Sequence, residues 1–199
     1  MKLILIRHGE TRWNKERRVQ GGDSDIELNV TGLNQARRIA SFLENEDIGV
    51  IISSPLQRAI ATANAIASLH DLPIEIDDRL KELNVGEFEG LALANLTTTF
   101  SQFLLQWGKG AQSARLPGGE TLQELQQRSW EAVGPFLAEH KDGAVVVVSH
   151  YFVTLSLILK ALDLPLDYFT KFKLDLGGMS IIEIEDRGTR LEVFNDTSY

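Results

Sequence analysis

Short apolar runs alternate along this chain with segments of helical periodicity. The apolar runs are Leu3–Ile6, Val50–Ile52, Ile74–Ile76, Val145–Val148, Ile181–Ile184 and Leu191–Phe194. Four consecutive valines, as in Val145–Val148, are typical of a strand that is buried on both faces. Such strands occur in parallel sheets that helices cover on both sides.

Helical patterns fill the intervals between these predicted strands. They extend over Leu33–Leu43, Pro55–Leu69, Thr121–His140 and Tyr151–Leu162. Ser54 is predicted to cap the second helix, with Pro55 at its first position. Thr121 and Glu124 have the spacing of a capping box. Alternating strands and helices predict the α/β class, here a single-domain, three-layer α/β/α sandwich with a mostly parallel central sheet.

Residues 91–116 fit this alternation less well. Phe100, Phe103, Leu104 and Trp107 suggest a helix, which a glycine-rich loop follows. We interpret the segment as a lid or cap over a substrate site within one domain that spans residues 1–199.

Composition narrows the range of functions. The 199 residues are about the length of one domain. The net charge is −8, from 20 basic and 28 acidic residues, and this acidity argues against nucleic-acid binding through phosphate neutralisation. Cysteine is absent and the four histidines show neither HxH nor HExxH spacing, so we expect no metal site and no cofactor.

The N-terminal segment does not resemble a targeting signal. Only the four apolar residues Leu3–Ile6 stand between Lys2 and Arg7, which is too short for the apolar part of a signal peptide or for a membrane span. We therefore expect a cytoplasmic protein without a membrane partner. The Leu191–Phe194 strand is expected at a sheet edge, where it could pair with the same strand of a second subunit and form a homodimer.

Two histidines follow predicted strands at equivalent positions. His8 comes directly after Arg7 at the end of LILIR, and His150 comes after Ser149 at the end of VVVVS. Ligands of open α/β sheets bind outside the carboxyl ends of the strands. The two imidazoles are therefore expected to converge, although a single histidine at a strand end could equally cap a turn.

An arginine and a glutamate are further candidates. Arg58 falls in the first turn of the Pro55–Leu69 helix, where the helix dipole disfavours a cation; a bound anion would reverse that preference. Glu82 follows the Ile74–Ile76 strand and would suit a general acid if its pKa were raised. Spacing alone leaves Glu87 and Glu89 as rivals to Glu82.

Several sequence blocks together carry a family resemblance. The blocks are RHGET (Arg7–Thr11) followed by Asn14, Gly32 with Gln35 and Ala36, SSPLQRAIATA (Ser53–Ala63), Leu80–Glu82 with Gly86, Glu89 and Gly90, PGGET (Pro117–Thr121), and Ser149–His150. In this order and spacing, over roughly residues 2–160, the chain resembles the histidine phosphatase superfamily, also called the phosphoglycerate mutase-like family, and within it the small phosphatases.

The resemblance implies a covalent mechanism. His8 would be the nucleophile that attacks phosphorus and becomes phosphohistidine, with a backbone carbonyl near Gly9 fixing its tautomer. Glu82 would protonate the leaving oxygen and then deprotonate the attacking water. The implied activity is metal-independent hydrolysis of a phosphomonoester, with a small phosphorylated metabolite as the partner.

The resemblance also implies how phosphate is bound. Arg7, Arg58 and His150 would clamp the phosphoryl oxygens, and Asn14 would add a polar contact. Tyr151 stands where the family usually has glycine. Its backbone N–H can still contact phosphate, while its ring is expected to narrow the pocket.

Two other functions remain open at this point. A cofactor-dependent phosphoglycerate mutase would use the same chemistry, but the stretch from Gly90 to Pro117 is short and contains only Lys109 and Arg115 as basic residues. A phospho-ligand binding module on the same fold would not hydrolyse its ligand, since fold alone does not fix function.

Overall fold

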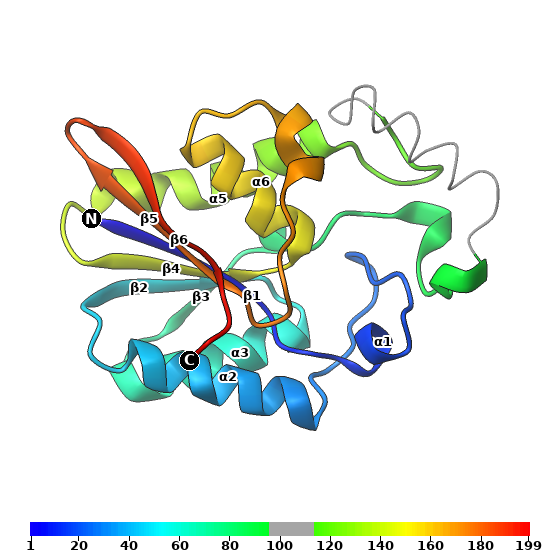
Figure 1. Cartoon of the computed structure of the whole chain (residues 1–199), viewed down its shortest axis with the longest axis horizontal. Coiled ribbons are helices and arrows are strands. Elements are labelled where there is room, and N and C mark those ends of the chain that lie inside the picture. The colour runs from blue at the N-terminus through cyan, green and yellow to red at the C-terminus, as the bar shows by residue number, and fades with distance from the viewer. Residues whose placement is uncertain (96–113) are drawn as a thin grey trace.

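A central sheet forms the middle layer of the protein (Figure 1). The computed structural model describes residues 1–95 and 114–199. Within them the strands are β1 (Lys2–Arg7), β2 (Ile48–Ser53), β3 (Ile74–Ile76), β4 (Ala144–Ser149), β5 (Met179–Glu185) and β6 (Gly188–Asp196). Their order across the sheet is β3-β2-β4-β1-β5-β6. β3, β2, β4 and β1 run parallel, and β5 and β6 are antiparallel additions. The predicted mostly parallel sheet is thus confirmed.

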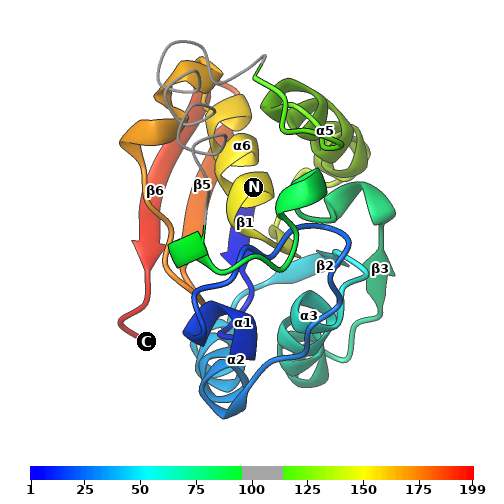
Figure 2. The ribbon, with the colours of Figure 1, turned by 90° about the vertical axis from the view of Figure 1, so that its right-hand side faces the viewer.

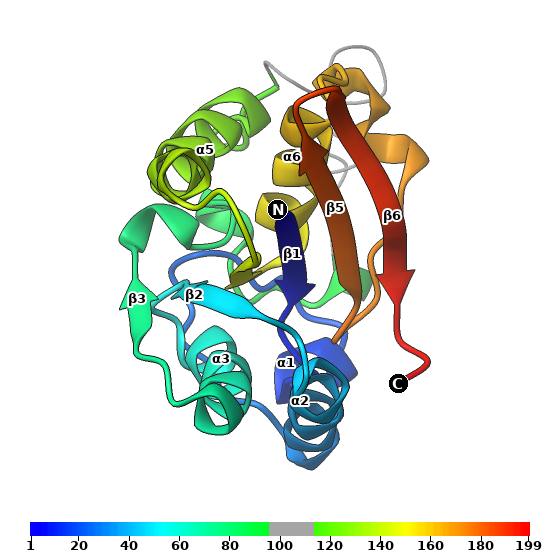
Figure 3. The same ribbon diagram turned by 90° about the vertical axis from the view of Figure 1, so that its left-hand side faces the viewer.

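Helices cover the two faces of this sheet. They are α1 (Arg12–Lys15), α2 (Val30–Leu43), α3 (Gln57–His70), α5 (Leu122–Glu139) and α6 (Tyr151–Ala161), with 3-10 turns η1 (Asp78–Leu80), η2 (Gly86–Phe88), η3 (Leu93–Asn95) and η4 (Leu166–Lys171). Figure 3 shows α2 and α3 on one face and α5 and α6 on the other. The predicted three-layer α/β/α sandwich is confirmed.

Strand β1 shows why its apolar run is continuous. Leu3 and Leu5 pack into the core beneath α5 and α6, whereas Ile4 and Ile6 pack into the core beneath α2 and α3. All four side chains are fully buried. Successive side chains of a strand point to opposite faces, so a strand covered on both sides needs an apolar residue at every position.

The start of α3 differs from the sequence prediction. The helix begins at Gln57, not at Pro55, and Ser54 does not cap it. Asp25 takes that role instead, since its Oδ1 accepts a hydrogen bond of 2.7 Å from the N–H of Gln57. Local capping rules consider only neighbouring residues and therefore do not predict a carboxylate from a distant loop. The hydroxyl of Ser54 contacts His150 instead.

The start of α5 and the place of β6 agree with the sequence predictions. The capping box of Thr121 and Glu124 is confirmed at the start of α5. Residues 96–113, which hold most of the predicted lid, lie outside the described residues. β6 lies at the sheet edge next to β5, as expected for the C-terminal strand. No helix in the described ranges combines the length and apolar character that a membrane span requires.

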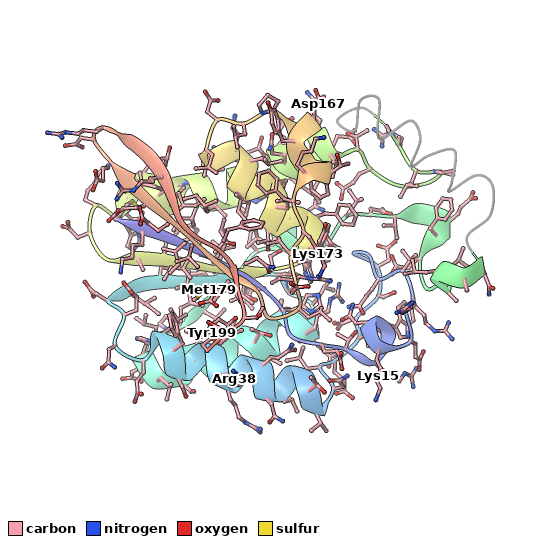
Figure 4. The ribbon with its side chains drawn as sticks, in the orientation of Figure 1. Lys15, Arg38, Asp167, Lys173, Met179 and Tyr199 are labelled. Atoms are coloured by element: carbon pink, nitrogen blue, oxygen red, sulfur yellow. The ribbon has the colours of Figure 1, made fainter. Side chains whose placement is uncertain are left out.

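The C-terminus returns to the α2 layer. The ring of Tyr199 lies 5.4 Å from that of Phe42 on α2, and its hydroxyl donates to the carbonyl of Gly177. Figure 4 shows Tyr199 near Arg38 of the same helix. The last residues therefore add to the packing of α2 beyond the sheet.

A close backbone approach joins α2 to the segment that follows β1. A Cβ atom on Gly32 would lie 2.1 Å from the carbonyl oxygen of Glu10, and one on Gly9 would lie 2.5 Å from the carbonyl oxygen of Gly32. Both distances are shorter than van der Waals contact allows. Glycine at these two positions thus lets the first turn of α2 press directly on the chain beside His8.

We predict that Gly32→Ala lowers the free energy of unfolding by about 1–3 kcal/mol because the added methyl group overpacks this contact. Helix propensity alone predicts the opposite sign, a gain of up to about 1 kcal/mol. Ser41→Ala, at an exposed position of the same helix, is the control and should change stability by less than about 0.5 kcal/mol. Urea unfolding measures both, and a more stable Gly32→Ala protein would contradict the close approach.

Candidate active site

The site lies at the carboxyl ends of β1 and β4, the end that faces the viewer in Figure 2. In the parallel register Arg7 pairs with Ser149, so His8 and His150 leave two neighbouring strands at the same level. Their ring centroids are 5.1 Å apart. The convergence of the two histidines that strand ends predicted is thereby confirmed.

His8 is held in one tautomer. Its side chain is buried, with 3% of the residue exposed, and its Nδ1 lies 2.7 Å from the carbonyl oxygen of Gly9. A carbonyl only accepts, so Nδ1 carries the hydrogen and Nε2 keeps a lone pair. Burial lowers the pKa of His8 well below its usual value, and Arg58 and Arg7 lower it further. The imidazole is therefore neutral at pH 7.

Arg58 is the largest fully buried side chain among the described residues. Its Nη1 donates to the carbonyl of Ser24 at 2.6 Å, and its Nη2 donates to that of Gly21 at 3.0 Å. Burial lowers the pKa of Arg58 to about 10, which leaves the guanidinium charged at pH 7. The oxygen partners of Arg58 among the described residues are two backbone carbonyls and the amide oxygen of Gln20. No carboxylate there is bound directly to the guanidinium, so its charge remains available to an anion.

Arg58 also sets the state of His150. Its Nε donates to Nδ1 of His150 at 3.2 Å, so the hydrogen of that imidazole is on Nε2. That Nε2 lies 2.7 Å from the hydroxyl oxygen of Ser54, the residue wrongly predicted to cap α3. Burial and the nearby Arg58 lower the pKa of His150 well below its usual value. His150 is thus a neutral hydrogen-bond donor rather than a cation.

Arg7 retains an unused donor. Its Nη1 donates to the carbonyl of Leu174 at 2.7 Å, and its guanidinium lies 5.1 Å from the centre of the Tyr151 ring. Its Nε is buried and has no hydrogen-bond partner among the described residues. A buried guanidinium N–H without an acceptor is a position for an oxygen of a bound anion.

Glu82 is the carboxyl group that the fold places in this site. It is 5% exposed, and its Oε1 accepts from the N–H groups of Leu83 at 2.8 Å and Phe152 at 3.2 Å. Burial raises the pKa of Glu82, and these hydrogen bonds, Arg58 and Arg7 oppose the rise. The protonated form is therefore favoured relative to an exposed glutamate.

The two rival glutamates lie elsewhere. Glu87 is exposed. Glu89 accepts hydrogen bonds from the N–H of Gly21 at 2.9 Å and from the hydroxyl of Ser24. Because Gly21 and Ser24 hold the guanidinium of Arg58, Glu89 supports the anion site from outside it.

A pocket of about 370 Å³ opens beside these groups. Arg7, Asn14, Gln20, Glu82 and Tyr151 line its polar end. The Oδ1 of Asn14 accepts from the N–H of Thr11 at 3.0 Å, whereas its NH₂ group has no partner among the described residues. Asn14 and Tyr151 therefore reach the same pocket as Arg7, as the resemblance implied.

Sequence reasoning missed Gln20. With its amide oxygen turned inward, Gln20 shares the hydrogen on Nε of Arg58 with His150, at 2.7 Å from that nitrogen. Its NH₂ group then donates to the hydroxyl of Thr11 at 2.6 Å. No local rule marks this glutamine, because its partners come from other segments.

A salt bridge behind Glu82 was also missed. Arg128 and Glu120 pair at 2.6 Å, Arg128 donates to the carbonyl of Glu82 at 3.1 Å, and Glu120 accepts from the N–H of Asn84 at 2.9 Å. This pair fixes the backbone at the carbonyl of Glu82 and at the N–H of Asn84. Glu120 lies within the PGGET block, which was the available signal.

The described parts of the chain contain no cluster of metal ligands. No three histidine, aspartate or glutamate side chains come together there in an arrangement that could hold an ion. The acid, the two histidines and the two arginines are the chemical groups that the fold brings together.

Comparison with known proteins supports the family resemblance that the sequence blocks indicated. The model of the histidine phosphatase superfamily (branch 1) matches residues 3–197. A probable phosphoglycerate mutase of Yersinia pestis is 33% identical, over the whole chain and 94% of that protein.

Solved structures resemble the fold as a whole. A mycobacterial glucosyl-3-phosphoglycerate phosphatase has a TM-score of 0.89 at 28% identity, with 98% of each chain covered. A phosphoserine phosphatase from Entamoeba histolytica, in complex with phosphoserine, has a TM-score of 0.85 at 30% identity, covering 99% of this chain and 98% of that one. The chain belongs to the histidine phosphatase superfamily.

Proposed function

We propose that this protein is a metal-independent phosphomonoester hydrolase that acts on a small phosphorylated metabolite through a phosphohistidine. Membership of the superfamily and the phosphatase neighbours support a phosphatase. The observation that carries the proposal is the state of His8. Its Nδ1–H is bound to a carbonyl, which leaves the Nε2 lone pair free, and the charges of Arg58 and Arg7 act on the same buried imidazole.

In the first step the Nε2 lone pair of His8 attacks phosphorus, and the bond from phosphorus to the ester oxygen breaks. Glu82 gives its proton to that oxygen, so the alcohol leaves in neutral form. His8 then carries a phosphoryl group on Nε2 and a positive charge, which the Gly9 carbonyl stabilises through Nδ1–H. Arg7 and Arg58 compensate the charge of the transferring phosphoryl group.

In the second step the carboxylate of Glu82 takes a proton from water, whose oxygen attacks phosphorus. The bond between Nε2 and phosphorus breaks and returns its electron pair to His8. Inorganic phosphate leaves, and both side chains regain their starting protonation states. Asn14 and the Nε2–H of His150 are further donors to the phosphoryl oxygens, the latter after exchanging Ser54 for the substrate.

The structure gives less support to a mutase. Arg115, one of the two basic residues between Gly90 and Pro117, pairs with Glu124 on α5 and donates to the carbonyl of Gly119 at 2.8 Å. It is thus bound away from the pocket instead of offering a site for a substrate carboxylate. Because one relative is a probable phosphoglycerate mutase, the first test below also measures mutase activity.

The first test measures products in EDTA. Wild type should release phosphate from a panel of phosphomonoesters, and His8→Ala should retain less than about a thousandth of that rate. His70→Ala, at the end of α3 and outside the site, is the matched control and should stay active. The panel includes 3-phosphoglycerate with and without 2,3-bisphosphoglycerate. Formation of 2-phosphoglycerate without phosphate release would identify a mutase, and binding without turnover would identify a binding module.

The second test examines Glu82 as the proton donor. Glu82→Gln should slow hydrolysis of an alkyl phosphate by at least about 100-fold, because its alkoxide leaves poorly without a proton. The kcat/KM for para-nitrophenyl phosphate, whose leaving group is already stable as an anion, should fall much less than the kcat/KM for the alkyl phosphate. The comparison uses kcat/KM because this constant excludes the later step in which Glu82 acts as a base for both substrates. The exposed Glu87→Gln is the matched control. Equal losses for both substrates would contradict the assignment.

The third test is the pH profile of kcat/KM. Activity needs neutral His8, whose pKa is lowered, and protonated Glu82, whose pKa is raised. The rate should fall at low pH as His8 gains a proton and at high pH as Glu82 loses one, giving a bell with its maximum near neutrality or on its acidic side. In Glu82→Gln the alkaline limb should disappear. A wild-type rate that rises steadily to pH 10 would exclude these roles.

A further inference from the structure

The pocket has a second end that the proposed chemistry does not use. Half of the described residues that line the pocket have aliphatic or phenylalanine side chains. They are Val19, Leu83, Val85, Phe88, Leu116 and Phe152, with the half-exposed Leu93 at the outer edge. Whatever is attached to the phosphoryl group has to lie against these walls.

The polar backbone of the same walls is already paired. Val19 donates to the carbonyl of Leu91 and accepts from the N–H of Gly90. The carbonyl of Phe88 accepts from Leu91, and the carbonyl of Leu116 accepts from Gly119. A hydroxyl or amino group on the substrate would find few free partners here and would lose its hydrogen bonds to water.

The cations of the pocket belong to its two extremes. Arg7 lies at the phosphoryl end. Arg17 and Arg18 are exposed and lie at the solvent edge, where Arg18 pairs with Glu16 at 2.8 Å and donates to the carbonyl of Gly90 at 3.1 Å. Among the described residues, the rest of the lining therefore offers apolar contact rather than positive charge.

One residue links the acid to this apolar surface. The N–H of Phe152 donates to Glu82, while its ring stacks on Phe169 with 5.3 Å between centroids and an angle of 8°. The wall is thus fixed in place directly beside the proton donor. An apolar group bonded to the ester oxygen would contact Phe152 while that oxygen receives the proton of Glu82.

We propose that this pocket selects phosphomonoesters whose organic group is an apolar alkyl or aryl body, in preference to short polar metabolites such as 3-phosphoglycerate or phosphoserine. The inference rests on the proposed hydrolase function and names its substrate class. Apolar contact in the transition state raises kcat/KM in proportion to the area that is buried.

The test uses ethyl, butyl and hexyl phosphate, whose leaving groups have nearly the same intrinsic reactivity. Each fully buried methylene is worth about fourfold in kcat/KM. Hexyl phosphate should therefore exceed ethyl phosphate by at least about tenfold, against a ceiling of about 250-fold for four buried methylenes. It should also exceed 3-phosphoglycerate and phosphoserine. A flat or falling series, or a preference for 3-phosphoglycerate, would overturn the inference.

Two variants test the wall itself. Leu93 and Leu91 lie two residues apart and are both substantially exposed, at 49% and 40%, but only Leu93 lines the pocket. Leu93→Ser should reduce the ratio of hexyl to ethyl phosphate by about threefold or more, and Leu91→Ser should leave it unchanged. Equal effects of the two variants, or no effect of Leu93→Ser, would count against the wall.

The two proposals fail in different ways. If folded wild type hydrolyses no ester, para-nitrophenyl phosphate included, the hydrolase function is wrong and this inference falls with it. If it hydrolyses the series without regard to chain length, the hydrolase function stands and only the substrate class is wrong.

Discussion

The buried charge of Arg58 is the constraint on which the rest of the site depends. A guanidinium with no exposed surface needs hydrogen-bond partners inside the protein, and the chain supplies two carbonyls, an amide oxygen and an imidazole nitrogen, all neutral. Those carbonyls belong to Gly21 and Ser24, which Glu89 holds in turn. In a chain with a net charge of −8, Glu82, Glu89 and Asp25 act on the charge of Arg58 without hydrogen-bonding to it. The guanidinium can therefore still pair directly with a small anion.

The sequence predicted most of the fold because its signals are local. Runs of buried residues such as Leu3–Ile6 and Val145–Val148 require helices on both faces of the sheet. The capping box at Thr121 identifies the start of α5 from two residues alone. At α3 the local rule failed, because Asp25 satisfies the N–H of Gln57 from another loop.

The site residues likewise fall into those that local signals predict and those whose partners are distant in the chain. His8 and His150 were predictable because they follow strands, and parallel pairing brings strand ends together. Ser54 and Gln20 were not, because each acts through a partner distant in the chain. Spacing alone left Glu87 and Glu89 as rivals to Glu82, and the family resemblance selected Glu82. The structure supplies the physical reason, since Glu82 is 5% exposed and accepts from the N–H groups of Leu83 and Phe152.

One physical cause prepares both halves of the proposed reaction. Removal from water disfavours the charged form of any group, so the same burial lowers the pKa of His8 and raises that of Glu82. A nucleophile must be unprotonated and a general acid must be protonated, and in water at neutral pH a glutamate would have lost its proton. The positive charges of Arg7 and Arg58 lower the pKa of both groups. They therefore favour neutral His8 but oppose protonated Glu82. The acid therefore depends on burial more than the nucleophile does, and the apolar wall that begins at Phe152 supplies that burial while also forming the surface for the leaving group.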